Sequence, residues 1–145
     1  MTQVPTPATR PAARPQAPHK RLTAGLADLH RALLTAQAVG HPAASNPYAL
    51  LQAVMHDPGF AWLRAYSDLI LRIDEASAKG ATPSAEAMQE FLLAATQLVE
   101  GGAAEDAAAG EAHARLRGFL LRRDVATAYA ALRDVLAALR QSHGQ

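Results

Sequence analysis

The chain contains no cysteine, so disulfide bonds, thiol catalysis and thiolate metal sites are excluded. Its apolar runs are too short to span a bilayer, and its N-terminal segment lacks the apolar stretch of a signal peptide. Its formal net charge of +1 provides no global field that would attract nucleic acid or a membrane surface. We therefore expect a cytoplasmic protein that binds neither nucleic acid nor a membrane.

Sequence typical of β-strands is also scarce. Aromatic and β-branched residues are few, and no stretch alternates apolar and polar residues over the length of a strand. Alanine, the residue with the highest helix propensity, is instead the most common residue. A chain of 145 residues is long enough for one domain with a hydrophobic core. The composition thus predicts a single-domain, all-α protein.

The first 20 residues differ in composition from the rest of the chain. They hold five prolines, which fix φ and lack the amide donor, so no helix is expected to run through them. They also carry Arg10, Arg14 and Lys20 without any acidic residue. We expect residues 1–20 to form a disordered, basic, polyproline-like tail and residues 21–141 to form the helical domain. A basic docking arm for an acidic surface is the functional alternative for the tail.

Apolar periodicity and capping signals predict the first four helices. A stripe of leucines at positions 22, 26, 29 and 33 predicts a helix over residues 21–39. A capping residue followed by proline marks the start of each further helix, at Asn46-Pro47, Asp57-Pro58 and Thr82-Pro83. These helices are expected to end near residues 56, 79 and 100. The inner face of the second helix is expected to carry Leu51, Val54 and Met55.

The last predicted helix, residues 111–141, changes the direction of its apolar face. Phe119 and its apolar neighbours face one way, whereas the apolar residues from Leu121 onward face nearly the opposite way at 100° per residue. Either the helix breaks near Arg122–Asp124 with Asp124 as a new cap, or its first half contacts two different partners. The whole pattern predicts a four- to five-helix antiparallel bundle with short connections.

The residue constellations needed for catalysis or metal binding are missing from the sequence. No histidine has the Glu-x-x-His spacing of a di-iron bundle, and the zinc motifs H-x-x-x-H and H-E-x-x-H are absent. No serine lies in a G-x-S-x-G context, and there is no glycine-rich phosphate loop. We therefore expect a non-enzymatic protein without a metal or cofactor.

An alternative function follows from the region with most of the aromatic residues. His56 could ligate haem or act as a base, although a histidine at a helix C-terminus also interacts with the helix dipole and the last carbonyls. Trp62 and Tyr66 have the spacing of core residues, and the same spacing would suit a pocket between helices. His30 beside the leucine stripe is a boundary residue or a second candidate ligand. The alternative is thus a small-molecule or haem-binding bundle with its pocket near Trp62 and Tyr66.

Two leucines stand on the polar faces of their helices. Leu71 shares a face with Arg64, Asp68 and Glu75, and Leu93 lies among the acidic residues of the fourth helix. Single exposed leucines are common in monomers. Together with the change of apolar face at Phe119, however, Leu71 and Leu93 indicate a surface for a second copy or a helical partner. We therefore expect an interaction or regulatory protein that self-associates, with a homodimer as its simplest form.

Residues 56–75, HDPGFAWLRAYSDLILRIDE, resemble a segment of small uncharacterised all-helical bacterial proteins. The His-Asp-Pro-x-Phe-Ala-Trp-Leu-Arg part, His56–Arg64, carries most of the resemblance. The resemblance implies a bacterial, all-helical protein and assigns no activity and no functional residue. The composition agrees with it, because abundant alanine and arginine with only Lys20 and Lys79 suggest a GC-rich genome.

Overall fold

The computed structural model describes residues 16–101 and 107–143, which contain six α-helices and no β-strand. Three short 3-10 helices (η) lie between them. In chain order the elements are α1 Pro18–Ala38, η3 Pro42–Ser45, α2 Pro47–His56, η4 Pro58–Leu63, α3 Arg64–Ala76, η5 Ala78–Gly80, α4 Ala85–Glu100, α5 Ala107–Gly118 and α6 Arg123–His143. The predicted all-helical class is confirmed, and the number of α-helices exceeds the expected four to five.

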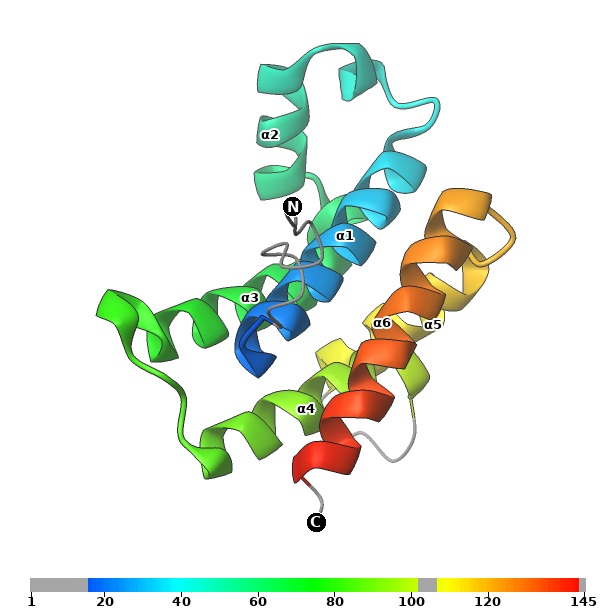
Figure 1. The fold of residues 1–145 in the computed structure, drawn as a ribbon. Helices are drawn as coiled ribbons and strands as arrows, with labels where there is room; N and C mark the ends of the chain where they lie inside the picture. Colours follow the sequence, from blue (N-terminus) through cyan, green and yellow to red (C-terminus); the bar gives the residue numbers. More distant parts are fainter. Residues whose placement is uncertain (1–15, 102–106, 144–145) are drawn as a thin grey trace, which may run out of the picture.

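Helix α1 lies at the centre of the molecule, between α3 and α6 (Figure 1), and makes its most extensive contacts with these two helices. The four leucines of its predicted stripe have no exposed surface. The helix begins at Pro18 rather than at Arg21, because a proline at the first helical position loses no hydrogen bond. Of the rest of the predicted tail, residues 16 and 17 precede the helix, and residues 1–15 lie outside the described residues.

Helices α1 and α6 approach each other closely at Gly25. A Cβ atom at this position would lie 2.9 Å from Cδ1 of Leu132, a buried residue of α6. Glycine in a helix interior costs about 1 kcal/mol relative to alanine. The close packing of α1 on α6 gives a physical reason for this weak helix former in the middle of α1.

The capping signals gave one correct helix start and two that need correction. Asn46 caps α2, because its side-chain oxygen accepts hydrogen bonds from the backbone amides of Tyr48 and Ala49. The predicted start at Thr82-Pro83 is wrong, since Ser84 is the cap of α4 and accepts from the amide of Ala87. Asp57 does accept a bond from the amide of Gly59, but the element that follows is the 3-10 helix η4.

The long C-terminal helix is broken, as the first of the two alternatives predicted. Helix α5 ends at Gly118 and α6 begins at Arg123, and Phe119, Leu120 and Leu121 lie in the turn between them, where the apolar face changes direction. Asp124 lies inside the first turn of α6 rather than at its cap, and its carboxylate is 3.3 Å from the guanidinium of Arg122. Residues 102–106, which precede α5, lie outside the described part of the chain.

The packing at Gly25 can be tested with side chains of two sizes. In Gly25→Ala, the gain in helix propensity of about 1 kcal/mol opposes a small shift of the Leu132 side chain, so we expect little net change in stability. In Gly25→Leu, the larger side chain overpacks the contact between α1 and α6 and should lower the free energy of unfolding by about 1–3 kcal/mol. Urea denaturation of both variants measures the difference. Equal stability of the two variants would contradict the close approach.

Candidate functional site

Helix α2 is set apart from the helices that form the core. It projects beyond one end of α1 (Figure 1) and makes its main contacts with the short helices η3 and η4. Seven of its ten residues are apolar and none is Asp, Glu, Lys or Arg. Among the described residues it is nevertheless the one α-helix without a buried side chain. An apolar helix in this position is a candidate contact surface.

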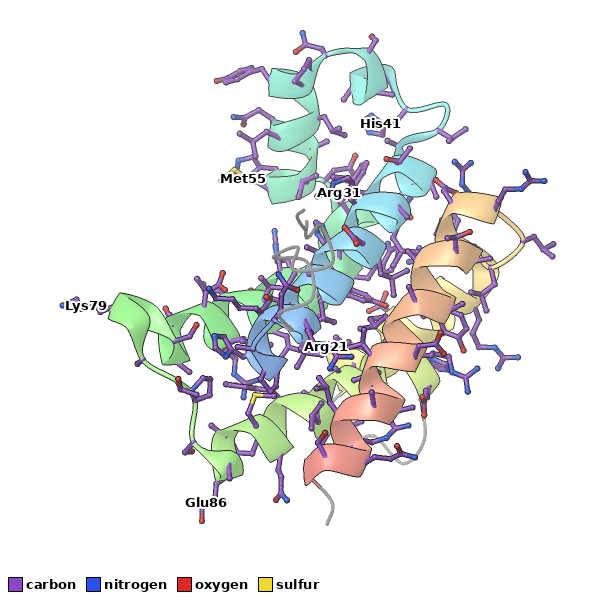
Figure 2. The ribbon with its side chains drawn as sticks, in the orientation of Figure 1. Arg21, Arg31, His41, Met55, Lys79 and Glu86 are labelled. Atoms are coloured by element: carbon purple, nitrogen blue, oxygen red, sulfur yellow. The ribbon has the colours of Figure 1, made fainter. Side chains whose placement is uncertain are left out.

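The two sides of α2 have different surroundings. Leu50, Ala53 and Val54 are partly buried and pack against the core. The opposite side, which we call the α2 outer face, carries Tyr48, Leu51 and Met55, whose exposed fractions are 72%, 53% and 51%. Figure 2 shows Met55 on the side of α2 that is turned away from α1. The prediction that Leu51 and Met55 face the core is therefore wrong, whereas Val54 does lie on the inner side.

Two side chains close the ends of the segment that carries α2. Nε2 of His41, before η3, lies 3.0 Å from Oδ2 of Asp57, after α2. Nδ1 of His41 accepts a hydrogen bond from the amide of Ala43, so Nε2 carries the proton and donates it to the carboxylate. Both ring nitrogens are thus engaged, and the pair holds the segment in place rather than presenting a free base. Neither His41 nor Asp57 was among the site residues predicted from the sequence.

A second contact fixes the C-terminal end of α2. The guanidinium of Arg64, at the start of α3, donates to the carbonyl oxygen of Met55 over 2.6 Å. This carbonyl belongs to the last turn of α2, where helix carbonyls have no partner within the helix. The buried Phe60 of η4 also packs edge-on against His41, with ring centroids 5.3 Å apart. The α2 outer face is therefore presented by a segment that is anchored at both ends.

The carboxyl of Asp57 is held in its charged form by its partners. The amide of Gly59 and the side chain of His41 both donate to it and lower its pKa, and partial desolvation opposes them only in part. A lowered pKa in the folded state stabilises the fold above the ordinary value of 3.8, and this contribution is lost as the pH falls through the folded value.

The predicted ligand residues Trp62 and Tyr66 lie in the core. Both are buried, and Nε1 of Trp62 donates to Oε1 of Gln37 on α1 over 3.1 Å. The ring of Phe119, between α5 and α6, stacks on Trp62 with centroids 6.1 Å apart and an interplanar angle of 12°. His56, by contrast, is exposed at the end of α2. The structure thus joins Trp62, Tyr66 and Phe119 and leaves His56 at the surface.

The two leucines of the predicted interface are exposed. Leu71 on α3 and Leu93 on α4 have exposed fractions of 56% and 60%. Phe119, the third predicted interface residue, is half-buried and uses one face of its ring on Trp62. That these three residues contact a partner stays a prediction.

Tyr66 has a hydroxyl group without a hydrogen-bond partner. The residue is fully buried, its ring lies 6.5 Å from that of His30, and its oxygen is one of two buried side-chain N or O atoms without a partner among the described residues. Burial raises the pKa of the Tyr66 hydroxyl, and the charge of Tyr129 adds to the shift. Burial also lowers the pKa of His30, with Arg31 contributing. Both shifts favour the neutral form of the group concerned.

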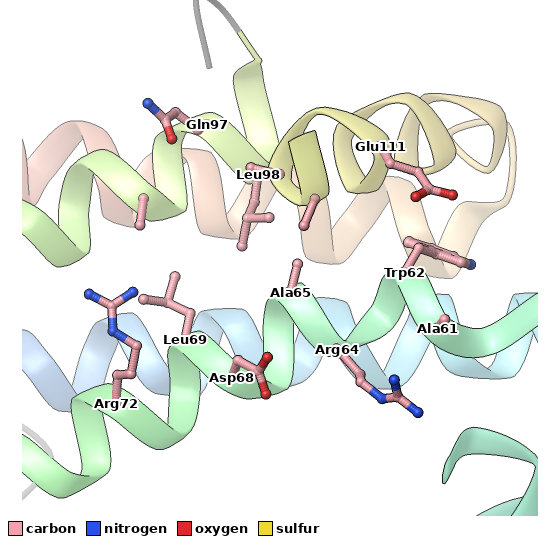
Figure 3. A pocket seen from close by; sticks show the side chains of 13 residues that line it. Ala61, Trp62, Arg64, Ala65, Asp68, Leu69, Arg72, Gln97, Leu98 and Glu111 are labelled. Atoms are coloured by element: carbon pink, nitrogen blue, oxygen red, sulfur yellow. The ribbon is translucent and has the colours of Figure 1, made fainter. Parts of the chain in front are cut away.

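A groove of about 410 Å³ runs between α3, α4 and α5. Its floor consists of small and aliphatic side chains, and Figure 3 shows Trp62 and Glu111 at one end with Arg72 and Gln97 at the other. The volume is within the range of small-molecule pockets. Trp62 lines this groove, but Tyr66, His30 and His56 do not.

No family model, curated protein or solved structure matches the chain. Within residues 16–101 and 107–143, no group of three or more acidic or histidine side chains could hold a metal ion, and no helix is long and apolar enough to cross a membrane. The resemblance of His56–Arg64 to bacterial helical proteins therefore stays a prediction, and the function must be argued from the geometry.

Sequence reasoning missed the α2 outer face, although the sequence contains a signal for it. A ten-residue helix without any charged residue has apolar side chains on every side. Such a helix is either surrounded by its own protein or contacts another molecule on one side. The capping signals at Asn46 and Asp57 limited α2 to a short element between two turns, where complete burial was the less plausible outcome.

Removing the unpartnered hydroxyl of Tyr66 tests whether this group is isolated in the core. An unsatisfied buried hydroxyl costs about 1–3 kcal/mol, so we expect Tyr66→Phe to be as stable as the wild type or more stable by about 1 kcal/mol. Thermal and urea denaturation measure the change. A clear loss of stability would instead reveal a partner of the hydroxyl, such as a bound water or ligand.

The pair formed by His41 and Asp57 makes a prediction about pH. We expect Asp57→Asn to be less stable than the wild type at pH 7, because it removes a carboxylate that two donors stabilise. The difference should shrink as the pH falls below the ordinary value of 3.8 and through the lowered pKa of folded Asp57, where the carboxylate of the wild type becomes protonated. Urea denaturation at a series of pH values gives this comparison. A difference that is constant with pH would contradict the role of the charge.

Proposed function

We propose that the chain is a non-enzymatic interaction or regulatory protein that self-associates, and that the α2 outer face is its contact surface. The observation that supports this proposal is the exposure of Tyr48, Leu51 and Met55 along one side of a helix without charged residues. The largest contiguous apolar patch on a protein surface is often an interaction site. The anchoring of α2 by Asp57 and Arg64 supports the same proposal, because a fixed surface loses little entropy on binding.

Small-molecule binding is the second candidate, and the groove beside Trp62 is the observation that favours it. Apolar side chains with Asp68 between them, and polar groups at both ends, would suit a ligand that has both apolar and polar groups. Haem finds less support than other ligands, because neither His30 nor His56 lines the groove. Native mass spectrometry of protein purified from its own host separates the two candidates. A bare dimer favours self-association, and a monomer with reproducible extra mass favours a ligand.

Charge substitution on the α2 outer face tests the proposed function. We expect the double variant Leu51→Asp/Met55→Asp to be monomeric at concentrations where the wild type forms dimers, because each aspartate would be buried without a partner in the interface. Sedimentation equilibrium over a range of concentrations measures the association. Both positions are half-exposed, so the monomer should keep its helical circular dichroism spectrum.

Matched variants control for the added charge and for the position of the interface. Leu121 is fully exposed in the turn between α5 and α6, so Leu121→Asp introduces the same substitution away from α2. It should leave the association unchanged. Leu71→Asp/Leu93→Asp tests the interface that the sequence predicted. If only this second pair abolishes the dimer, self-association stands and the α2 outer face is not its contact surface.

A further inference from the structure

We propose that the α2 outer face binds the same face of a second copy, and that the two α2 helices pair in antiparallel orientation about a two-fold axis near Leu51 and Gln52. This inference rests on the proposed function and specifies the partner and the geometry of the contact.

The charge of α2 favours its own copy as the partner. Residues Pro47–His56 include no Asp, Glu, Lys or Arg, so two copies of the helix meet without repulsion between charged side chains. A partner with a charged surface would gain no complementary contact from this helix and would lose hydration of its charges. A membrane surface is also a poor partner, because α2 lacks the basic residues that attract interfacial helices to anionic lipids. The same uncharged face of a second copy meets this requirement.

The order of side chains on α2 favours the antiparallel orientation. The outer face has Tyr48 near the N-terminal end, Leu51 in the middle and Met55 near the C-terminal end. An antiparallel pair would place Tyr48 of each copy beside Met55 of the other, a favourable contact between sulfur and an aromatic ring. It would also place the two Leu51 side chains together at the axis. A parallel pair would instead align the two helix dipoles, which repel each other in that arrangement.

The position and size of α2 decide how strong the contact can be. Because α2 projects from the molecule (Figure 1), a second copy can reach its outer face without first displacing another helix. Three exposed apolar side chains offer on the order of 300 Å² per copy, which is within the range of the largest apolar patch on a typical monomer. A standard interface buries about 800 Å² per partner. We therefore expect a weak dimer that depends on protein concentration.

Other exposed leucines offer less for such a contact. Leu71 and Leu93 lie on different helices, and each has charged neighbours at helical spacing. A two-fold contact centred on either leucine would bring like charges of the two copies together, which is unfavourable. The α2 outer face combines three neighbouring apolar side chains with the absence of charge.

The absence of cysteine makes single-cysteine cross-linking a direct test of this geometry. Tyr48→Cys, Leu51→Cys and Met55→Cys are prepared as full-length proteins and treated with a short bismaleimide at a concentration where the wild type is dimeric. We expect Leu51→Cys to cross-link with itself. We expect a mixture of Tyr48→Cys and Met55→Cys to give several times more cross-linked dimer than either variant alone. Leu121→Cys, at a fully exposed position, measures random collision.

The possible results distinguish a failure of the proposed geometry from a failure of the proposed self-association. Equal self-cross-linking of Tyr48→Cys and Leu51→Cys would indicate a parallel pair and overturn the antiparallel geometry. If the wild type is dimeric but the three α2 variants cross-link no more than Leu121→Cys, the inference falls while self-association stands. If the wild type sediments as a monomer at all concentrations, both the inference and the proposed self-association fall.

Discussion

The burial of α1 between α3 and α6 is the constraint on which the rest of the fold depends. Its leucine stripe is fully covered, and Gly25 allows the backbone of α1 to come close to Leu132 on α6. The remaining helices add to this centre, as Glu100 of α4 does by lying 3.6 Å from both Arg133 and Arg140 of α6. Helix α2 lies outside this centre, because it only packs partly buried side chains against the core and has no fully buried one.

The molecule thus combines two kinds of helix. Those of the core bury apolar stripes against one another. Helix α2 packs only its inner side on the core, and polar contacts from His41 to Asp57 and from Arg64 to Met55 fix its C-terminal end. A hydrogen bond to a charged group is stronger than one between neutral groups and depends more on direction. Such contacts fix the orientation of α2 without covering its apolar side. The proposed function depends on this arrangement, in which polar contacts position α2 while the α2 outer face stays exposed.

Local signals predicted the parts of the fold that are determined locally. The leucine spacing of α1 and the Asn46-Pro47 cap depend on neighbours in sequence, and both predictions hold. Thr82 and Ser84 are both good capping residues, and the choice between them depends on how α4 meets the core. The sequence also could not show which side of α2 faces the core. Its apolar residues lie all around the helix, and tertiary contacts decide which of them are covered. The groove beside Trp62 requires three helices to be placed in space, which no spacing could show.

Trp62 connects three parts of the chain that are distant in sequence. It donates a hydrogen bond to Gln37 of α1, packs on Tyr66 of α3 and stacks on Phe119 beyond α5. As the single tryptophan, it is also the dominant source of intrinsic fluorescence in the molecule. Its emission therefore reports whether these segments have come together during folding. Because none of these partners belongs to α2, the signal distinguishes assembly of the core from events at the α2 outer face.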